Sequence, residues 1–159
     1  MLKKLFQTNN DAAPLILRVS LAVVMFPHGA QKVLGWFGGY GFSGTMKFFT
    51  ETAHIPAPFA FLALLAEFAG SIAIFFGLLT RLSAFGIGMT IAVAALMMHV
   101  KNGFFMNWNG KVPSAEGFEY HILVVAIALA LMLQGSGKLA LDSLIYRKLV
   151  RADSPQKTK

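Results

Sequence analysis

The amino-acid sequence predicts an all-α integral membrane protein, built as a four-helix transmembrane bundle with a short interfacial helix in its first outer loop. The 159 residues are 56% hydrophobic and 13% charged, with a mean hydropathy of +0.62, whereas a typical soluble domain is about 25% charged. A soluble domain of this length lacks the interior volume to bury so much apolar surface. Four apolar stretches are also each long enough to cross about 30 Å of hydrocarbon.

Residues 13–34 form the first predicted span. Two lysines precede it, as in a signal peptide, but the charged residues Arg18 and Lys32 interrupt its apolar run, so we expect an uncleaved signal-anchor. Residues 57–79 form the second span. Pro56 stands at its start, where a missing backbone N–H costs little.

Residues 82–100 form the third predicted span and residues 118–133 the fourth, which is the shortest. The pair Thr80–Arg81 is expected to form a tight turn between the second and third spans, which makes them antiparallel neighbours. The small-residue pairs Ala66/Gly70 and Ala84/Gly88 are expected to serve helix packing within or between chains.

The two outer loops mix aromatic residues with glycine, at residues 35–42 and 102–108. This composition favours a belt of anchors at the level of the lipid headgroups. A lid over a pocket is the alternative interpretation. In the first loop Ser43 is a candidate N-cap, and residues 45–53 are expected to form the interfacial helix.

The distribution of lysine and arginine predicts the orientation. With four spans both termini share one side, and nine cations lie on that side against four on the other. The nine are Lys3, Lys4, Arg81, Lys138, Arg147, Lys148, Arg151, Lys157 and Lys159, and the four are Lys32, Lys47, Lys101 and Lys111. We therefore expect a bacterial inner-membrane protein with both termini in the cytoplasm. Its segments are a cytoplasmic stretch (1–12), the transmembrane domain (13–144) and a basic, partly disordered tail (145–159).

Several chemistries are excluded by composition. The chain has no cysteine, which excludes disulfides, thiolate zinc sites, cysteine-ligated iron–sulfur clusters and c-type haem attachment. The net charge is +7 and the pI about 9.9. Because these cations cluster at the ends of apolar spans, they indicate contact with the lipid bilayer and no nucleic-acid partner.

Polar residues inside the spans are the candidate functional residues, because an ionisable group at mid-membrane costs about 2.5–3.5 kcal/mol. Arg18, His28 and Lys32 share one face of the first span, and Glu67 lies midway along the second. The candidates for ligand binding or proton handling are Arg18, His28, Gln31, Glu67, His99, Asn102 and Glu119. They predict a polar pocket in the outer half of the bundle, with Glu67 at its floor.

Each of these residues also has a structural interpretation. Arg18 and Glu67 would form an ion pair that fixes helix register. Glu119 would be an interfacial cap paired with Lys111 or His121. The other structural assignments place His28 and His99 as core histidines satisfied by backbone or amide groups, and Lys32, Lys101 and His121 as side chains that snorkel to the headgroups.

In their order and spacing these residues resemble the DoxX family of small four-span bacterial membrane proteins, over about residues 15–144. The motifs are Leu17-Arg18, His28-Gly29-Ala30-Gln31-Lys32, Glu67-Phe68-Ala69-Gly70, Gly77-Leu78-Leu79-Thr80-Arg81, His99 with Asn102-Gly103-Phe104-Phe105, Gly117-Phe118-Glu119-Tyr120, and Gly135-Ser136-Gly137-Lys138-Leu139-Ala140-Leu141-Asp142. In the last motif Ala140 replaces the family's serine. The resemblance implies the four-span fold and a link to membrane oxidoreductase complexes; related DoxD-type proteins are subunits of a thiosulfate:quinone oxidoreductase.

Three functions follow from the candidate residues. The first is an oxidoreductase-associated subunit that binds a quinone or another lipid-soluble molecule, with electrons supplied by the ligand or by partner redox proteins. The second is a haem or metal site, with His28, His99, Glu67 and Glu119 as alternative ligands. The third is a non-enzymatic carrier or scaffold, and a homo-oligomer is compatible with each.

Overall fold

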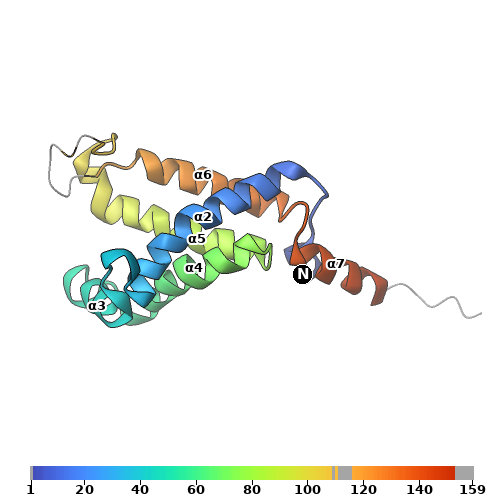
Figure 1. Ribbon diagram of the computed structural model, residues 1–159, viewed down its shortest axis with the longest axis horizontal. Helices are drawn as coiled ribbons and strands as arrows, with labels where there is room; N and C mark the ends of the chain where they lie inside the picture. The colour runs from blue at the N-terminus through green and yellow to red at the C-terminus, as the bar shows by residue number, and fades with distance from the viewer. Residues whose placement is uncertain (1, 109, 111–115, 153–159) are drawn as a thin grey trace, which may run out of the picture.

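The computed structural model describes residues 2–108, 110 and 116–152 (Figure 1). These residues form helices and connecting segments, and none of them lies in a strand. The α-helices are α1 (Leu2–Phe6), α2 (Ala12–Leu34), α3 (Gly41–Lys47), α4 (Ala57–Phe75), α5 (Thr80–Ala94), α6 (Glu119–Gln134) and α7 (Leu141–Ala152). The predicted all-α fold is confirmed.

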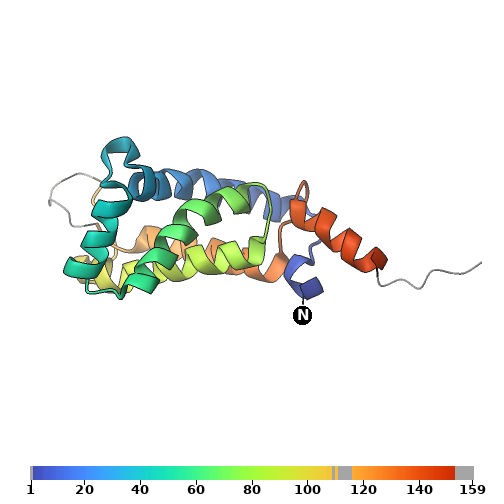
Figure 2. The same ribbon diagram turned by 90° about the horizontal axis from the view of Figure 1, so that it is seen from below.

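Four long helices form the bundle (Figures 1 and 2). α2 packs on α4, α4 on α5, α5 on α6 and α6 on α2, which closes the ring. Among the described residues, three helical stretches are long and apolar enough to cross a membrane: α2, α4 and Thr80–Asn102, in which a π-helical turn (Ala95–His99) and a 3-10 turn (Val100–Asn102) follow α5. α6 is apolar but has 16 residues, or about 24 Å of helix.

The bundle has two different ends (Figure 2). α1 and α7 lie together at one of them, called here the terminal end, and α3 lies at the other, called the loop end. The predicted tail begins inside α7, and its residues 153–159 lie outside the described part of the chain, as does Lys111. The predicted disorder of residues 153–159 and the predicted pairing of Glu119 with Lys111 therefore lie outside the described residues.

The turn between α4 and α5 differs from the prediction. α4 ends at Phe75, four residues before the predicted end of the second span, and Thr80 and Arg81 are the first residues of α5 rather than a turn. The chain reverses at Gly77, whose φ is +63°, and at Leu79, whose φ is +48°. The prediction failed because contacts from α7, described below, set the start of α5.

The interfacial helix also starts earlier than predicted. The glycine-rich reversal after α2 is complete at Gly41, whose φ is +68°, and α3 begins there. Ser43 therefore lies inside the helix and is not its N-cap. A π-helical turn (Phe48–Thr52) continues α3 to within one residue of the predicted end.

Small residues allow the helices to approach closely, as the sequence predicts. A Cβ on Gly88 would lie 3.0 Å from the Ala128 Cβ, at the contact of α5 with α6. At the crossing of α2 and α4 the fit is tighter, because a Cβ on Gly29 would lie 2.7 Å from the Phe68 Cα. The core between these helices is apolar and includes Leu21, Met25, Ile74, Ile87, Val124 and Leu131.

Candidate functional site

The polar face of α2 points into the bundle over most of its length. Arg18 and Met25 are 2% and 0% exposed, whereas Lys32 is half-buried and His28 is exposed. The spacing of three and four residues predicts this shared face, and the backbone of α2 is helical throughout. The polar side chains on this face of α2 lie at different levels of the bundle, so each of them has different partners.

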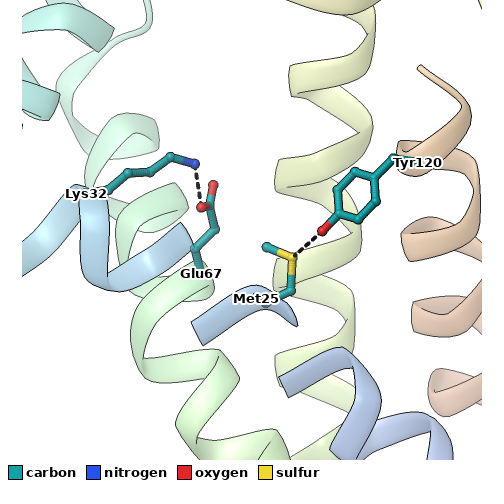
Figure 3. A network of polar contacts seen from close by, with 4 residues as sticks. All are labelled: Met25, Lys32, Glu67 and Tyr120. Atoms are coloured by element: carbon teal, nitrogen blue, oxygen red, sulfur yellow. Dashed lines mark hydrogen bonds and ion pairs between the residues drawn. The ribbon is translucent and has the colours of Figure 1, made fainter. Parts of the chain in front are cut away.

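Glu67 of α4 forms an ion pair with Lys32 of α2 (Figure 3). The Glu67 side chain is 1% exposed, whereas the Lys32 side chain is 32% exposed. The predicted ion pair between Arg18 and Glu67 is thus wrong, and Lys32 is not a free snorkelling side chain. Lys32 lies close to the level at which Gly29 contacts the backbone of Glu67. Arg18 lies about four helical turns from Lys32, toward the terminal end.

Tyr120 lies near this ion pair on α6, across from α2. Its hydroxyl donates a hydrogen bond of 3.6 Å to the Met25 Sδ (Figure 3). The His28 ring is 6.3 Å from the Tyr120 ring, centroid to centroid. Lys32, Glu67, His28 and Tyr120 are called here the Glu67 cluster.

The rings of His99 and His121 are in contact at the loop end, with centroids 4.1 Å apart and planes inclined by 43°. The Nδ1 atom of His99 hydrogen-bonds with the Glu116 carbonyl oxygen at 2.9 Å, in agreement with a histidine satisfied by backbone. His121 is 6% exposed, and its Nδ1 atom has no partner among the described atoms. The prediction that His121 snorkels to the headgroups is therefore wrong, because its ring packs inward against His99.

Besides His99 and Arg18, three further predicted site residues do not join the Glu67 cluster. Gln31 donates to the Phe37 carbonyl oxygen at 3.4 Å, in the first loop. Asn102 donates to the Glu116 carbonyl oxygen at 3.1 Å. Glu119 accepts hydrogen bonds from the backbone N–H of Met106 (2.9 Å) and the indole N–H of Trp108 (3.0 Å). All three organise loops.

Arg18 lies at the terminal end, where its guanidinium is bound by carbonyl oxygens. It donates to Ile74 (3.4 Å) and Phe75 at the end of α4, and to Ser136 (3.0 Å), Lys138 (3.0 Å) and Leu139 (2.6 Å) in the segment before α7. The planar fork of five N–H donors suits such a set of acceptors. Arg18 therefore joins α2, α4 and the segment before α7.

Asp142 is the buried acid that sequence reasoning missed. It is 2% exposed, and its carboxylate accepts the backbone N–H groups of Leu79 (2.7 Å) and Thr80 (2.9 Å) at the start of α5. Burial raises the pKa of Asp142, while these hydrogen bonds and the charge of Arg18 oppose the increase. The Gly-x-Gly motif that precedes Asp142 was the available signal, because the chain there has no room for a side chain: a Cβ on Gly137 would lie 2.7 Å from the Asp11 carbonyl oxygen.

The alternative ligand set for a metal is not assembled. His28, His99, Glu67 and Glu119 each have the separate partners given above, and the described residues contain no group of three His, Asp or Glu side chains placed to hold a metal ion.

An apolar groove of about 350 Å³ lies on the seam between α2 and α4. Its lining includes Ala22, Val23 and Phe26 of α2, and Ser71, Ile72 and Phe75 of α4. Ser71 is one helical turn from Glu67 on the same face of α4. The groove therefore ends close to the Glu67 cluster.

The chain is similar to several known proteins. The sequence model of the DoxX family matches residues 13–100. The chain is 32% identical to "Putative oxidoreductase CatD" of Bacillus subtilis (strain 168) over 137 residues, 86% of this chain and 90% of that protein. It is 34% identical to an uncharacterized protein of Haemophilus influenzae (84% and 83% covered) and 29% identical to inner membrane protein YqjF of Escherichia coli (87% and 95% covered). No solved structure matches significantly.

Proposed function

The chain belongs to the DoxX family of membrane proteins, and we propose from this premise that it is an oxidoreductase-associated subunit that binds a quinone. The observation that carries the proposal is the Glu67 cluster, which brings together a buried carboxylate, a half-buried ammonium group, a half-buried phenol and an exposed imidazole on an apolar bundle. The name of the Bacillus subtilis relative supports the oxidoreductase part.

The donors of the cluster suit the two carbonyl oxygens of a quinone. Among the described residues, the Tyr120 hydroxyl donates only to a thioether sulfur. Sulfur is a weak acceptor, so a quinone oxygen would compete well for this hydroxyl group. The Lys32 ammonium group has three donors and uses one on Glu67. The groove on the α2–α4 seam offers an apolar surface for the tail of the molecule.

Reduction of a quinone to a quinol takes two electrons and two protons. In this proposal a partner redox protein supplies the electrons, since the chain has no cysteine for a cluster. Glu67 and His28 are the groups of the cluster that can exchange protons with the quinone oxygens. An ionisable residue within a membrane span is by default a candidate for such a role.

Native mass spectrometry of the protein from its own membranes tests the proposal. We expect an adduct with the mass of a quinone, and binding of added short-chain ubiquinone or menaquinone that weakens about tenfold in Tyr120→Phe and in Glu67→Gln, the value of one hydrogen bond to a buried polar group. Tyr40→Phe and Glu51→Gln are matched controls, since both side chains are exposed at the loop end. A protein without adduct that binds neither quinone would overturn the proposal.

We also propose that the loop end faces the outside of the bacterial inner membrane and that both termini are cytoplasmic. The excess of lysine and arginine near the terminal end supports this orientation. Because the chain has no cysteine, Lys47→Cys and Lys148→Cys each give a single labelling site. A membrane-impermeant maleimide should label Lys47→Cys in intact spheroplasts and Lys148→Cys only after permeabilisation, and the reverse pattern would contradict the orientation.

A further inference from the structure

We propose that α7 and the segment before it bind anionic phospholipid headgroups at the terminal end of the bundle. The first observation is a group of leucines exposed outside the membrane-spanning helices. Leu139 is 85% exposed, Leu141 42% and Leu144 53%. Exposed apolar side chains that adjoin a membrane span fit the boundary between headgroups and acyl chains, where such residues leave water.

The exposed charged side chains of α7 and of the segment before it are all positive within the described residues 135–152. Lys138, Arg147, Lys148 and Arg151 are all exposed. The one acid in α7, Asp142, is buried and accepts two backbone N–H groups of α5, so it does not neutralise the exposed cations. A cationic surface with leucines among its charges complements the phosphates of an anionic leaflet.

The cations and leucines share one side of α7. Leu141, Leu144 and Lys148 follow a spacing of three and four residues, and Arg147 and Arg151 flank this row. The buried side of the helix, which carries Asp142, faces the bundle. Figure 2 shows α7 leaving the bundle beside α1, at the end where α2 begins and α6 ends. The row therefore starts at the level where the apolar spans stop.

The position of Leu139 is fixed by the fold. Its φ is +53°, a conformation that costs a bulky residue energy and persists only where surrounding contacts impose it. Arg18 imposes this backbone conformation of Leu139 through hydrogen bonds to the carbonyl oxygens of Lys138 (3.0 Å) and Leu139 (2.6 Å). The bonds hold the backbone and leave both side chains exposed. Leucine beside lysine suits a lipid surface better than an acidic protein or free phosphate, which would use the cation alone.

A fluorescent label on α7 tests this inference, and its outcome does not depend on quinone binding. Leu144→Cys gives one site for the environment-sensitive dye NBD. The full-length protein is reconstituted in liposomes of phosphatidylcholine, with and without one third phosphatidylglycerol. We expect blue-shifted NBD emission in the anionic liposomes, reversed by high salt because the attraction is electrostatic.

Removing two cations should reverse the shift. In the background of Leu144→Cys, Arg147→Gln with Arg151→Gln should lower the ratio of lipid-embedded to water-exposed label about 30-fold, from about 1 kcal/mol for each cation near an anionic surface. Lys47→Gln with Lys101→Gln is the matched control, since it removes the same charge at the loop end and should leave the ratio unchanged. Equal emission in anionic and neutral liposomes would overturn the proposal, as would a shift that follows protein density and so reports a second copy of the chain.

Discussion

Arg18 and Asp142 hold the turn between α4 and α5 from its two sides. Arg18 donates to the carbonyl oxygen of Ile74, at the end of α4, and Asp142 accepts the N–H of Thr80, at the start of α5. Each side chain thus satisfies backbone groups that a helix leaves unpaired at its terminus. Gly77 between them has no room for a side chain, because a Cβ there would lie 2.5 Å from the Ala140 Cβ. The turn is fixed by residues distant in sequence.

Removal of the Asp142 carboxylate should destabilise the bundle. Asp142→Ala leaves the buried N–H groups of Leu79 and Thr80 without an acceptor, which costs about 1–2 kcal/mol. Asp142→Asn keeps an acceptor oxygen and should cost much less. Unfolding in mixed micelles of detergent and sodium dodecyl sulfate measures both. If alanine and asparagine cost the same, the carboxylate does not cap α5.

The pH dependence of Asp142 follows from the direction of its pKa shift. Burial raises the pKa of this carboxyl in the folded protein above its ordinary value of 3.8. The folded protein therefore holds the Asp142 proton to a higher pH than the unfolded protein does. Because of this difference, the contribution of Asp142 to the free energy of unfolding falls as the pH rises from about 3.8 through the folded pKa. As the pH rises from about 3.8 through the folded pKa, the difference in free energy of unfolding between the wild type and Asp142→Asn should therefore change in favour of Asp142→Asn. A gain by the wild type over this range would contradict the shift.

Two glycines inside membrane-spanning helices should respond oppositely to alanine. In Gly29→Ala the new Cβ would meet backbone atoms of Phe68 and Glu67 at 2.7–2.8 Å, so α2 and α4 must separate, at a cost of about 1–3 kcal/mol. In Gly70→Ala the nearest atom is 3.7 Å away, on the flexible side chain of Ile87, and alanine favours a helix by about 1 kcal/mol. Thermal unfolding in detergent should rank Gly70→Ala above the wild type and Gly29→Ala below it.

Much of the bundle could be predicted from the sequence because span length depends on local apolar runs. The bounds of the predicted first and fourth spans agree with those of α2 and α6 within one residue at each end, although α6 is shorter than the three described stretches that are long enough to cross a membrane. The boundary at Thr80 could not be predicted, since Asp142 sets it from another helix. A local sequence pattern does not indicate a contact between residues that are distant in the sequence.

The side-chain partners were harder to predict than the helices. The sequence places Arg18 and Lys32 on one face of α2, and either could reach an acid on α4. The choice depends on the axial offset of the helices, which the close contact of Gly29 with Glu67 fixes. His121 was misassigned for a similar reason, because its burial depends on His99 of a neighbouring helix.

The unequal exposure of Lys32 and Glu67 predicts unequal effects of the two single substitutions. In Lys32→Gln the Glu67 carboxylate, 1% exposed, stays buried without its partner, and loss of one partner of a buried ion pair costs about 3–5 kcal/mol. In Glu67→Gln the lysine, 32% exposed, can turn its ammonium group toward the headgroups, so the cost should be smaller.

The double variant separates the interaction from the substitutions. Lys32→Gln with Glu67→Gln leaves no unpaired charge and should be more stable than Lys32→Gln alone, although it carries one more change. A double-mutant cycle of the free energy of unfolding in detergent measures this coupling. If the single losses were equal and simply added in the double variant, the ion pair would contribute nothing to the packing of α2 on α4. The expected order instead follows from which of the two charges can leave the bundle interior.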